Sequence, residues 1–324
     1  MEQKKLRRKP DRRRRWRSYL GFRGMTLRDW LPIVIAAFIP ILIAFGTWRI
    51  TTGQGKLENQ RAAAERELAE QRAQDEALQA YLDQMNNLLL EHNLRDSEPG
   101  SEVPTLARAR TLTVLSTLDP SRKTAVIQFL AEANLITLGP TASMDAVPIL
   151  ELTGADLSGT DLSNMSLVHT NLLEADLREA NLSGTGMMRA NLTKANLTNA
   201  TLRDTQLGHA GLLETDLSNA KLRDANIGHA NLSAANLSNA DLRNTGLRYT
   251  GWPDANLSNA DLRGADLTDA HVSEQQLRSA ASLEGATMPD GQTLRGGETP
   301  HGPTFEEWLK SKGGGEDGEN SGSS

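Results

Sequence analysis

The sequence predicts a mainly β protein in which a solenoid of short repeats follows a set of α-helices. Three observations predict this fold class. A hydrophobic residue recurs at every fifth position from Leu152 to Leu277. Residues 56–95 are rich in Ala, Glu, Gln and Leu, which favours a long helix. A run of uncharged, mostly apolar residues, Leu31–Thr47, lies nearer the N-terminus.

Composition limits the chemistry. The chain has no cysteine, which excludes disulfides, iron–sulfur clusters and cysteine-based zinc sites. Its net charge of −6 hides an asymmetry: residues 1–29 hold twelve Lys/Arg against three acidic residues, a local charge of +9, which leaves −15 for the remainder. The two ends of the chain are therefore expected to meet different partners or different sides of a barrier.

Residues 30–48 are predicted to form a transmembrane helix that acts as a signal anchor. Trp30 and Trp48 bracket the apolar run, and Arg28 and Arg49 flank it in turn, as at membrane interfaces. A buried core helix is the alternative, because the run is short. The excess of basic residues before it predicts a cytoplasmic N-terminus and an extracytoplasmic remainder. Within the basic segment 1–29, anionic-lipid binding is favoured over nucleic-acid binding for Arg12, Arg13, Arg14 and Arg15.

Two helical regions follow. In residues 56–95 a heptad pattern improves from Leu78 onward, which fits either a coiled-coil homodimer or a monomeric stalk that packs on the next segment. Residues 105–138 are predicted to form a helical pair, with Asp119 as the N-cap and Pro120 at the first position of the second helix. This pair is expected to cover the first coil of the solenoid, whose strand edges would otherwise be unpaired.

The repeat occupies residues 150–280. A small residue, mostly Ala or Thr, stands two positions before each hydrophobic one, and Asn or Asp commonly lies between them, as in Ala175-Asp176-Leu177. Neither a helical nor a strand period generates a five-residue pattern. Such repeats stack on their neighbours and share one continuous core.

This pattern resembles the pentapeptide-repeat family. The resemblance implies a right-handed quadrilateral β-helix with four pentads per coil, leucines at the middle of each side and small residues at the corners. Met165 and Gln275 break the small-residue rule, and a local bulge or a widened coil is expected at Trp252-Pro253. Segments such as LQAYLDQMNNLLLEHNLR resemble bacterial membrane proteins that carry pentapeptide repeats.

Two columns of residues spaced by twenty would stack on the surface of such coils. The first, beside several aspartates, is interpreted either as a compensated charge ladder or as a binding stripe for an anionic partner. The second is interpreted as surface decoration, with metal binding or acid sensing as alternatives. The columns are Arg203, Arg223, Arg243 and Arg263, and His169, Arg189, His209, His229 and Tyr249.

The remaining C-terminal residues divide into two segments. Residues 281–312 are predicted to form a turn and a short helix that starts at a Thr304–Glu307 capping box. Residues 313–324 form an acidic tail of the composition typical of disorder.

No catalytic triad, phosphate loop or metal-ligand spacing is present, so neither an enzyme nor a cofactor is predicted. The leading hypothesis is a membrane-anchored scaffold that presents a β-helical rod to an unknown protein partner. The alternative, implied by the resemblance because some soluble family members protect DNA gyrase from quinolones, is a DNA-mimicking gyrase modulator. Residues 150–280 carry sixteen Asp/Glu but also ten Lys/Arg, which opposes DNA mimicry, and a nucleic-acid partner is not expected.

Overall fold

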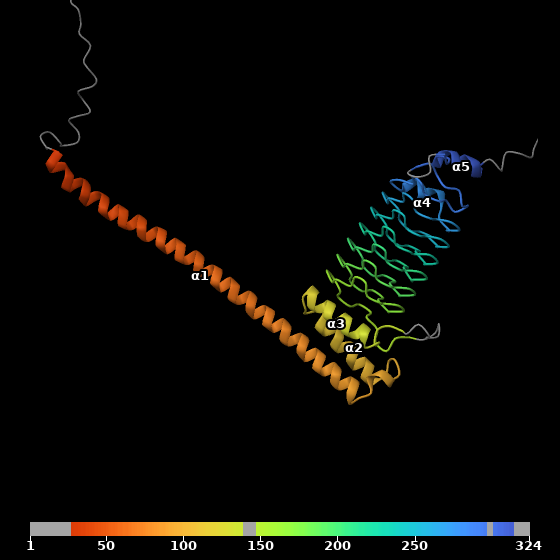
Figure 1. Ribbon diagram of the computed structural model, residues 1–324, viewed down its shortest axis with the longest axis horizontal. Helices are drawn as coiled ribbons and strands as arrows, with labels where there is room; N and C mark the ends of the chain where they lie inside the picture. Colours follow the sequence, from red (N-terminus) through yellow and green to blue (C-terminus); the bar gives the residue numbers. More distant parts are fainter. Residues whose placement is uncertain (1–26, 139–146, 297–300, 314–324) are drawn as a thin grey trace, which may run out of the picture. The chain divides into compact units, whose positions relative to one another are not determined.

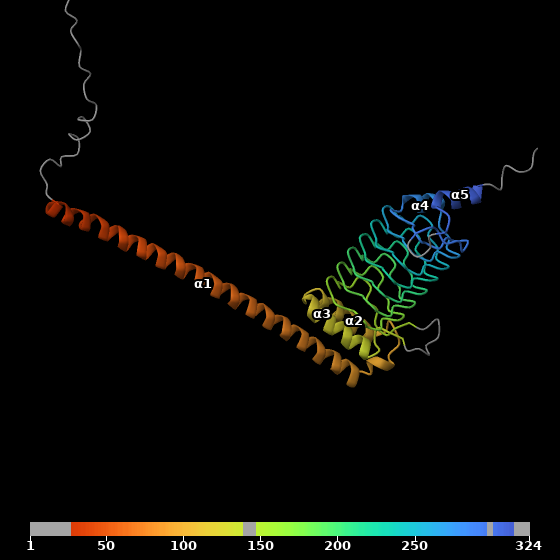
Figure 2. The same ribbon diagram turned by 45° about the horizontal axis from the view of Figure 1, so that its top comes forward.

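The computed structural model describes residues 27–138, 147–296 and 301–313, in two compact units, Met1–Glu70 and Gln71–Ser324. Its helices are α1 (Leu27–Leu90), the 3-10 turn η2 (Leu94–Asp96), α2 (Glu102–Leu115), α3 (Pro120–Glu132), α4 (Glu274–Ser279) and α5 (Phe305–Gly313). The β-helix lies between α3 and the C-terminal helices, as Figure 1 and Figure 2 show. The basic residues Arg12–Arg15 lie outside the described residues.

Helix α1 is continuous through both segments that the sequence divides, the apolar run and the stalk. Its apolar side chains from Ile35 to Trp48 are exposed, with Phe38 at 60% and Leu42 at 65%. No helix in the described part of the chain is both long and apolar enough to cross a membrane, so the spanning helix expected at residues 30–48 is not confirmed.

The C-terminal part of α1 packs on its own chain. Tyr81, Met85 and Leu88 are buried in one cluster with residues of α2, α3 and the solenoid, and Leu78 and Leu82 pack against that cluster. The Tyr81 hydroxyl also lies 2.9 Å from the Thr111 hydroxyl of α2. The heptad residues Leu78, Leu82 and Met85 therefore pack on the helical pair of the same chain, as the monomeric alternative expects.

Helices α2 and α3 form the expected cap. The Asp119 side chain accepts hydrogen bonds from the backbone N–H groups of Ser121 and Arg122, and Pro120 occupies the first turn. Partial burial of Asp119 opposes ionisation, but the hydrogen bonds from Ser121 and Arg122 and the Arg122 charge lower its pKa to about 2. This N-cap therefore stays ionised over the physiological range, where it stabilises the start of α3.

Helix α3 sits on the first coil of the solenoid. Its Lys123 is buried, with Nζ 2.8 Å from a carboxylate oxygen of Asp156. The Thr124 hydroxyl accepts a hydrogen bond from the backbone N–H of Asp161 at 3.1 Å. Buried Lys123 was not expected from sequence, because a lysine in a helix usually faces solvent.

Each coil of the solenoid spans twenty residues. Parallel bridges join residues one coil apart, for example Thr201 to Lys221 and Lys221 to Asp241, instead of long strands. The repeating leucines are 0–1% exposed from Leu152 to Leu267, and inward threonines such as Thr205 donate to a carbonyl of the neighbouring coil, here Leu182, at 2.8 Å. The corner residue two positions after each leucine has a left-handed backbone, as at Asn239, where φ is 58°.

The regular repeat stops at Ser273, before the expected end at 280. Helix α4 replaces one side of the last coil, and the Ser273 and Gln276 side chains form a capping box around its first turn. The Gln276 amide donates to the carbonyls of Trp252 and Ala255 at 2.6 and 2.9 Å. After α4 the chain forms two more sides of the solenoid. They are shifted by one residue, because Asp261 pairs with Ser282 and Asp266 with Thr287, each 21 residues apart instead of 20.

The coil that contains Trp252 keeps its hydrogen-bond ladder. The Trp252 side chain is fully buried, and its backbone N–H donates to His271 at 3.1 Å. Bonds beside it are longer than most, with Gly251 N to Ala230 O at 3.4 Å. Of the two expectations at Trp252-Pro253, the slightly lengthened bonds fit a widened coil and not a bulge.

The end of the described chain closes over the last coil. Helix α5 starts at the expected capping box, in which the Thr304 backbone N–H donates to Glu307 at 2.8 Å and Glu307 N–H returns to the Thr304 hydroxyl at 3.2 Å. Trp308 is buried, and its indole N–H donates to the Asp290 carboxylate at 3.1 and 3.2 Å.

Candidate interaction faces

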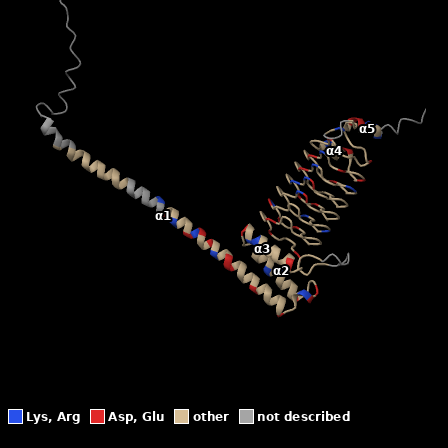
Figure 3. Ribbon diagram, viewed as in Figure 1, with Lys and Arg blue, Asp and Glu red and all other residues tan. Residues whose placement is uncertain are grey.

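The solenoid has four faces, and each outward position of the repeat forms a column along them. The arginine face is the side whose inward residues are Leu162, Leu182, Leu202, Leu222, Leu242 and Leu262, each buried. The residue after each leucine points outward in a parallel coil, so Arg203, Arg223, Arg243 and Arg263 occupy consecutive coils about 5 Å apart. Figure 3 shows basic and acidic residues interspersed along the coils.

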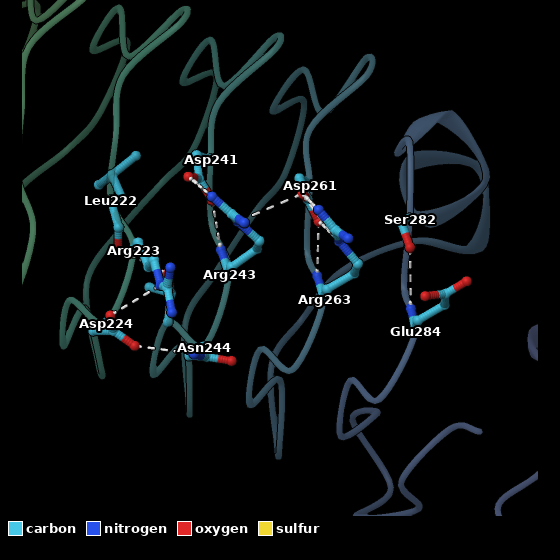
Figure 4. A network of polar contacts seen from close by, with 11 residues as sticks. Leu222, Arg223, Asp224, Asp241, Arg243, Asn244, Asp261, Arg263, Ser282 and Glu284 are labelled. Atoms are coloured by element: carbon cyan, nitrogen blue, oxygen red, sulfur yellow. Dashed lines mark hydrogen bonds and ion pairs between the residues drawn. The ribbon is translucent and has the colours of Figure 1, made fainter. Parts of the chain in front are cut away.

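The arginines of the last two coils on this face are paired with aspartates of their own strand. Asp241 accepts hydrogen bonds from Nε and Nη2 of Arg243 at 2.7 and 2.6 Å. Asp261 pairs with Arg263 in the same way, at 2.9 and 2.5 Å, and lies 3.7 Å from Arg243 (Figure 4). The hydrogen-bonded guanidiniums lower the pKa of both carboxyls below their ordinary value.

The arginines of the two preceding coils are arranged differently. The positions that correspond to Asp241 and Asp261 hold Thr201 and Lys221. Arg223 contacts Asp224 instead, with 3.2 Å between Nε and Oδ2, and Asn244 donates to the other oxygen of that carboxylate at 3.0 Å. This contact is an ion pair and not a hydrogen bond, so the buried Nε of Arg223 has no hydrogen-bond partner among the described residues. Only the last two arginines of the column are thus bound by an aspartate two residues before them.

The second column is a stack of rings at a corner of the solenoid. The imidazole centroids of His209 and His229 are 4.6 Å apart with 10° between their planes, and the Tyr249 ring follows at 4.8 Å and 13°. Burial and the charge of Arg189 lower the pKa of His169, which lies further along the column. Parallel rings present their nitrogens side by side and do not converge on one point.

The ring column borders positions without side chains. Gly208 and Gly228 precede His209 and His229 on one face, and both have ordinary backbone angles and room for a Cβ. The large exposed apolar side chains of the solenoid, within the described residues, are Met188 and Tyr249, which lie at the two ends of this strip. The sequence alone does not single out these glycines, because their twenty-residue spacing is apparent only when outward positions are aligned coil by coil.

Chemical groups suited to catalysis do not gather in the described structure. The described residues contain no cluster of three or more His, Cys, Asp or Glu side chains that could hold a metal ion. An open cavity of about 780 Å³ lies beside α4, lined by Asn256, Ser258, Ser273 and Gln276 among others, and its hydroxyl and amide groups bond mostly to one another. The surface columns are therefore the features on which function can be argued.

Comparison with known proteins identifies one family. "Pentapeptide repeats" matches the chain in 8 copies, over residues 151–185, 187–224, 215–250 and 254–289. These ranges cover the solenoid and the residues beyond α4 that rejoin it. None of the curated proteins matches the chain.

Solved structures similar to this chain include the pentapeptide-repeat proteins HetL and Rfr23. HetL, involved in heterocyst differentiation regulation in the cyanobacterium Nostoc sp. strain PCC 7120, is 30% identical over 44% of this chain and 86% of its own, with a TM-score of 0.28. Rfr23 from the cyanobacterium Cyanothece 51142 is 30% identical over 36% and 69%, with a TM-score of 0.17. QnrB1, a plasmid-mediated fluoroquinolone resistance protein, is 18% identical over 44% and 84%, with a TM-score of 0.23.

Proposed function

Because the chain belongs to the pentapeptide-repeat family, we propose that it is a non-catalytic, membrane-attached scaffold whose solenoid binds another protein through its outward columns. One observation carries the proposal. The core is filled by buried leucines from all four sides of each coil, and the polar, charged and aromatic side chains stand outward in straight columns. A rigid surface with regularly spaced groups suits recognition of an extended partner surface.

Membrane attachment is supported by the N-terminal unit. The apolar side chains of α1 between Ile35 and Trp48 are solvent-exposed, which is costly in water unless another apolar phase covers them. Twelve basic residues precede this stretch in the sequence and suit anionic lipid headgroups. The same bias of positive charge supports a cytoplasmic N-terminus and a solenoid on the other side of a bacterial membrane.

A DNA-mimicking gyrase modulator is less well supported. Mimicry of DNA needs a continuous acidic surface. The arginine face instead interleaves Arg243 and Arg263 with Asp241 and Asp261, and Lys221 adds a further cation. The proposed location of the solenoid also separates it from cytoplasmic topoisomerases.

Photo-crosslinking in cells tests the scaffold directly. A photoreactive residue is placed at one exposed corner position per face: Glu214, Asn239, Asp204 or Tyr249. These corners already tolerate varied side chains, so each variant should fold. We expect one or two of the four positions to yield the same discrete crosslinked protein, because a binding face points in one direction. Absence of a discrete product at all four positions would mean that the solenoid is only a spacer.

A further inference from the structure

The arginine face divides into two halves of different charge. In the C-terminal half, Asp241 and Asp261 each place both carboxylate oxygens against the guanidinium two residues later, as Figure 4 shows. In the N-terminal half, the corresponding positions carry a hydroxyl at Thr201 and an ammonium at Lys221. The backbone is the same in both halves, because Thr201, Lys221, Asp241 and Asp261 are joined in series by parallel bridges.

The N-terminal half therefore has cations without the carboxylates that the fold places beside them elsewhere. Within the described residues, Arg203 and Lys221 form neither a hydrogen bond nor an ion pair through their side chains, and both are exposed. Arg203 acts only at longer range, as one of several charges that lower the pKa of Asp241. Arg223 has a single carboxylate contact, Asp224, which lies on the corner side of the column.

The C-terminal half, where each arginine binds an aspartate, indicates which chemical group the N-terminal half can bind. A carboxylate seated between the strand and the arginine makes two parallel hydrogen bonds, a geometry that the guanidinium fork favours over a point charge. Two such places lie one coil apart, about 5 Å, beside Arg203 and Arg223. That separation suits two carboxylates on neighbouring side chains of a peptide.

We propose that Arg203, Lys221 and Arg223 bind an acidic segment of the partner protein, whose two carboxylates take the places that Asp241 and Asp261 hold in the following coils. The inference rests on the proposed scaffold function and names the chemistry of its partner. Exposed ion pairs are individually weak and screened by salt, so the segment contributes orientation and rate of encounter more than affinity.

The chain offers a sharp test of this site. The double variant Thr201→Asp/Lys221→Asp builds into the N-terminal half the carboxylates that the C-terminal half already has. Thr193→Asp/Lys194→Asp is its matched control, since it changes the same residue types by the same charge on the opposite face of the solenoid. The Thr201/Lys221 variant should keep the circular dichroism of the full chain, because aspartate already occupies the corresponding position in three other coils, at Asp161, Asp241 and Asp261. The control should keep it too, because both of its substitutions lie at outward positions of the repeat.

Binding is measured by fluorescence anisotropy with a labelled oligoglutamate peptide, and with a neutral oligoglutamine peptide as a probe of non-ionic binding. The full chain should bind oligoglutamate, more weakly as salt is added, and should not bind oligoglutamine. In the Thr201/Lys221 variant the affinity should fall about tenfold, as for the loss of two exposed pairs. The Thr193/Lys194 control should stay within about twofold of the parent, since charge at that distance is screened.

Three results would overturn the inference: no binding of oligoglutamate by the parent, equal losses in the two variants, or a loss seen only with anionic phospholipid vesicles, which would make the face a lipid site. The scaffold is judged separately. If oligoglutamate fails but crosslinking at Glu214 or Tyr249 captures a partner, this inference falls and the scaffold stands.

Discussion

Replacement of Trp252 by alanine is expected to lower the free energy of unfolding by about 3–5 kcal/mol. The indole is fully buried within a coil, and its N–H donates to the Thr250 hydroxyl at 2.6 Å. Truncation would remove the largest buried side chain of the core and leave a cavity, because the coils above and below are held by their hydrogen-bond ladder. Chemical denaturation followed by circular dichroism measures the loss.

Two further variants separate packing from local strain. Trp252→Leu restores the residue that most other repeats carry, so its cost should be well below that of Trp252→Ala. Tyr249→Ala removes an exposed ring from the same coil and should cost less than about 1 kcal/mol. If Trp252→Ala costs no more than Tyr249→Ala, the indole does not support the core in the way argued here.

The second large effect concerns the cap. Leu130→Asp places a carboxylate without a partner in the buried cluster shared by α3 and the first coil, and should cost more than about 4 kcal/mol. Loss of the cap would also expose the strand edge and leucines of the first coil, which promotes end-to-end association. Light scattering after size exclusion should therefore detect larger species.

The control for the cap is Gln128→Asp, which introduces the same side chain at an exposed position of the same helix. It should change the free energy of unfolding by no more than about 0.5 kcal/mol. The particle mass measured by light scattering should stay that of the parent. A monomeric, stably folded Leu130→Asp protein would show that the solenoid does not depend on α3 for its N-terminal end.

Much of this architecture follows from local sequence. The five-residue period identifies the buried leucines, because only residues facing the interior must recur at that spacing. Asp119 with Pro120, and Thr304 with Glu307, are start signals that depend on neighbouring residues alone. Such features are readable because the interactions that hold them lie within a few residues in the chain.

Other features depend on contacts far apart in the chain. Leu277 keeps the five-residue register, so the sequence hides the short helix α4, whose position depends on the Gln276 amide reaching Trp252 and Ala255. Lys123 is buried because Asp156 lies across from it, which the sequence of α3 does not reveal.

The sequence also predicts part of the surface arrangement. Spacing by twenty residues places the arginine and ring columns, and the rings of His209, His229 and Tyr249 do stack. The division of the arginine face was missed, because it depends on the residues two positions before each arginine, compared coil by coil. Thr201 and Lys221 were overlooked for that reason.

The central claim is that the solenoid is presented by a membrane-attached protein on the extracytoplasmic side. Protease accessibility of a C-terminal tag in intact spheroplasts tests it most directly, with a cytoplasmic protein as the control for lysis. We expect the tag to co-sediment with membranes and to be cleaved without lysis. Protection of the tag until lysis, or its recovery in the soluble fraction, would contradict the claim and direct the search for a partner to the cytoplasm, topoisomerases first.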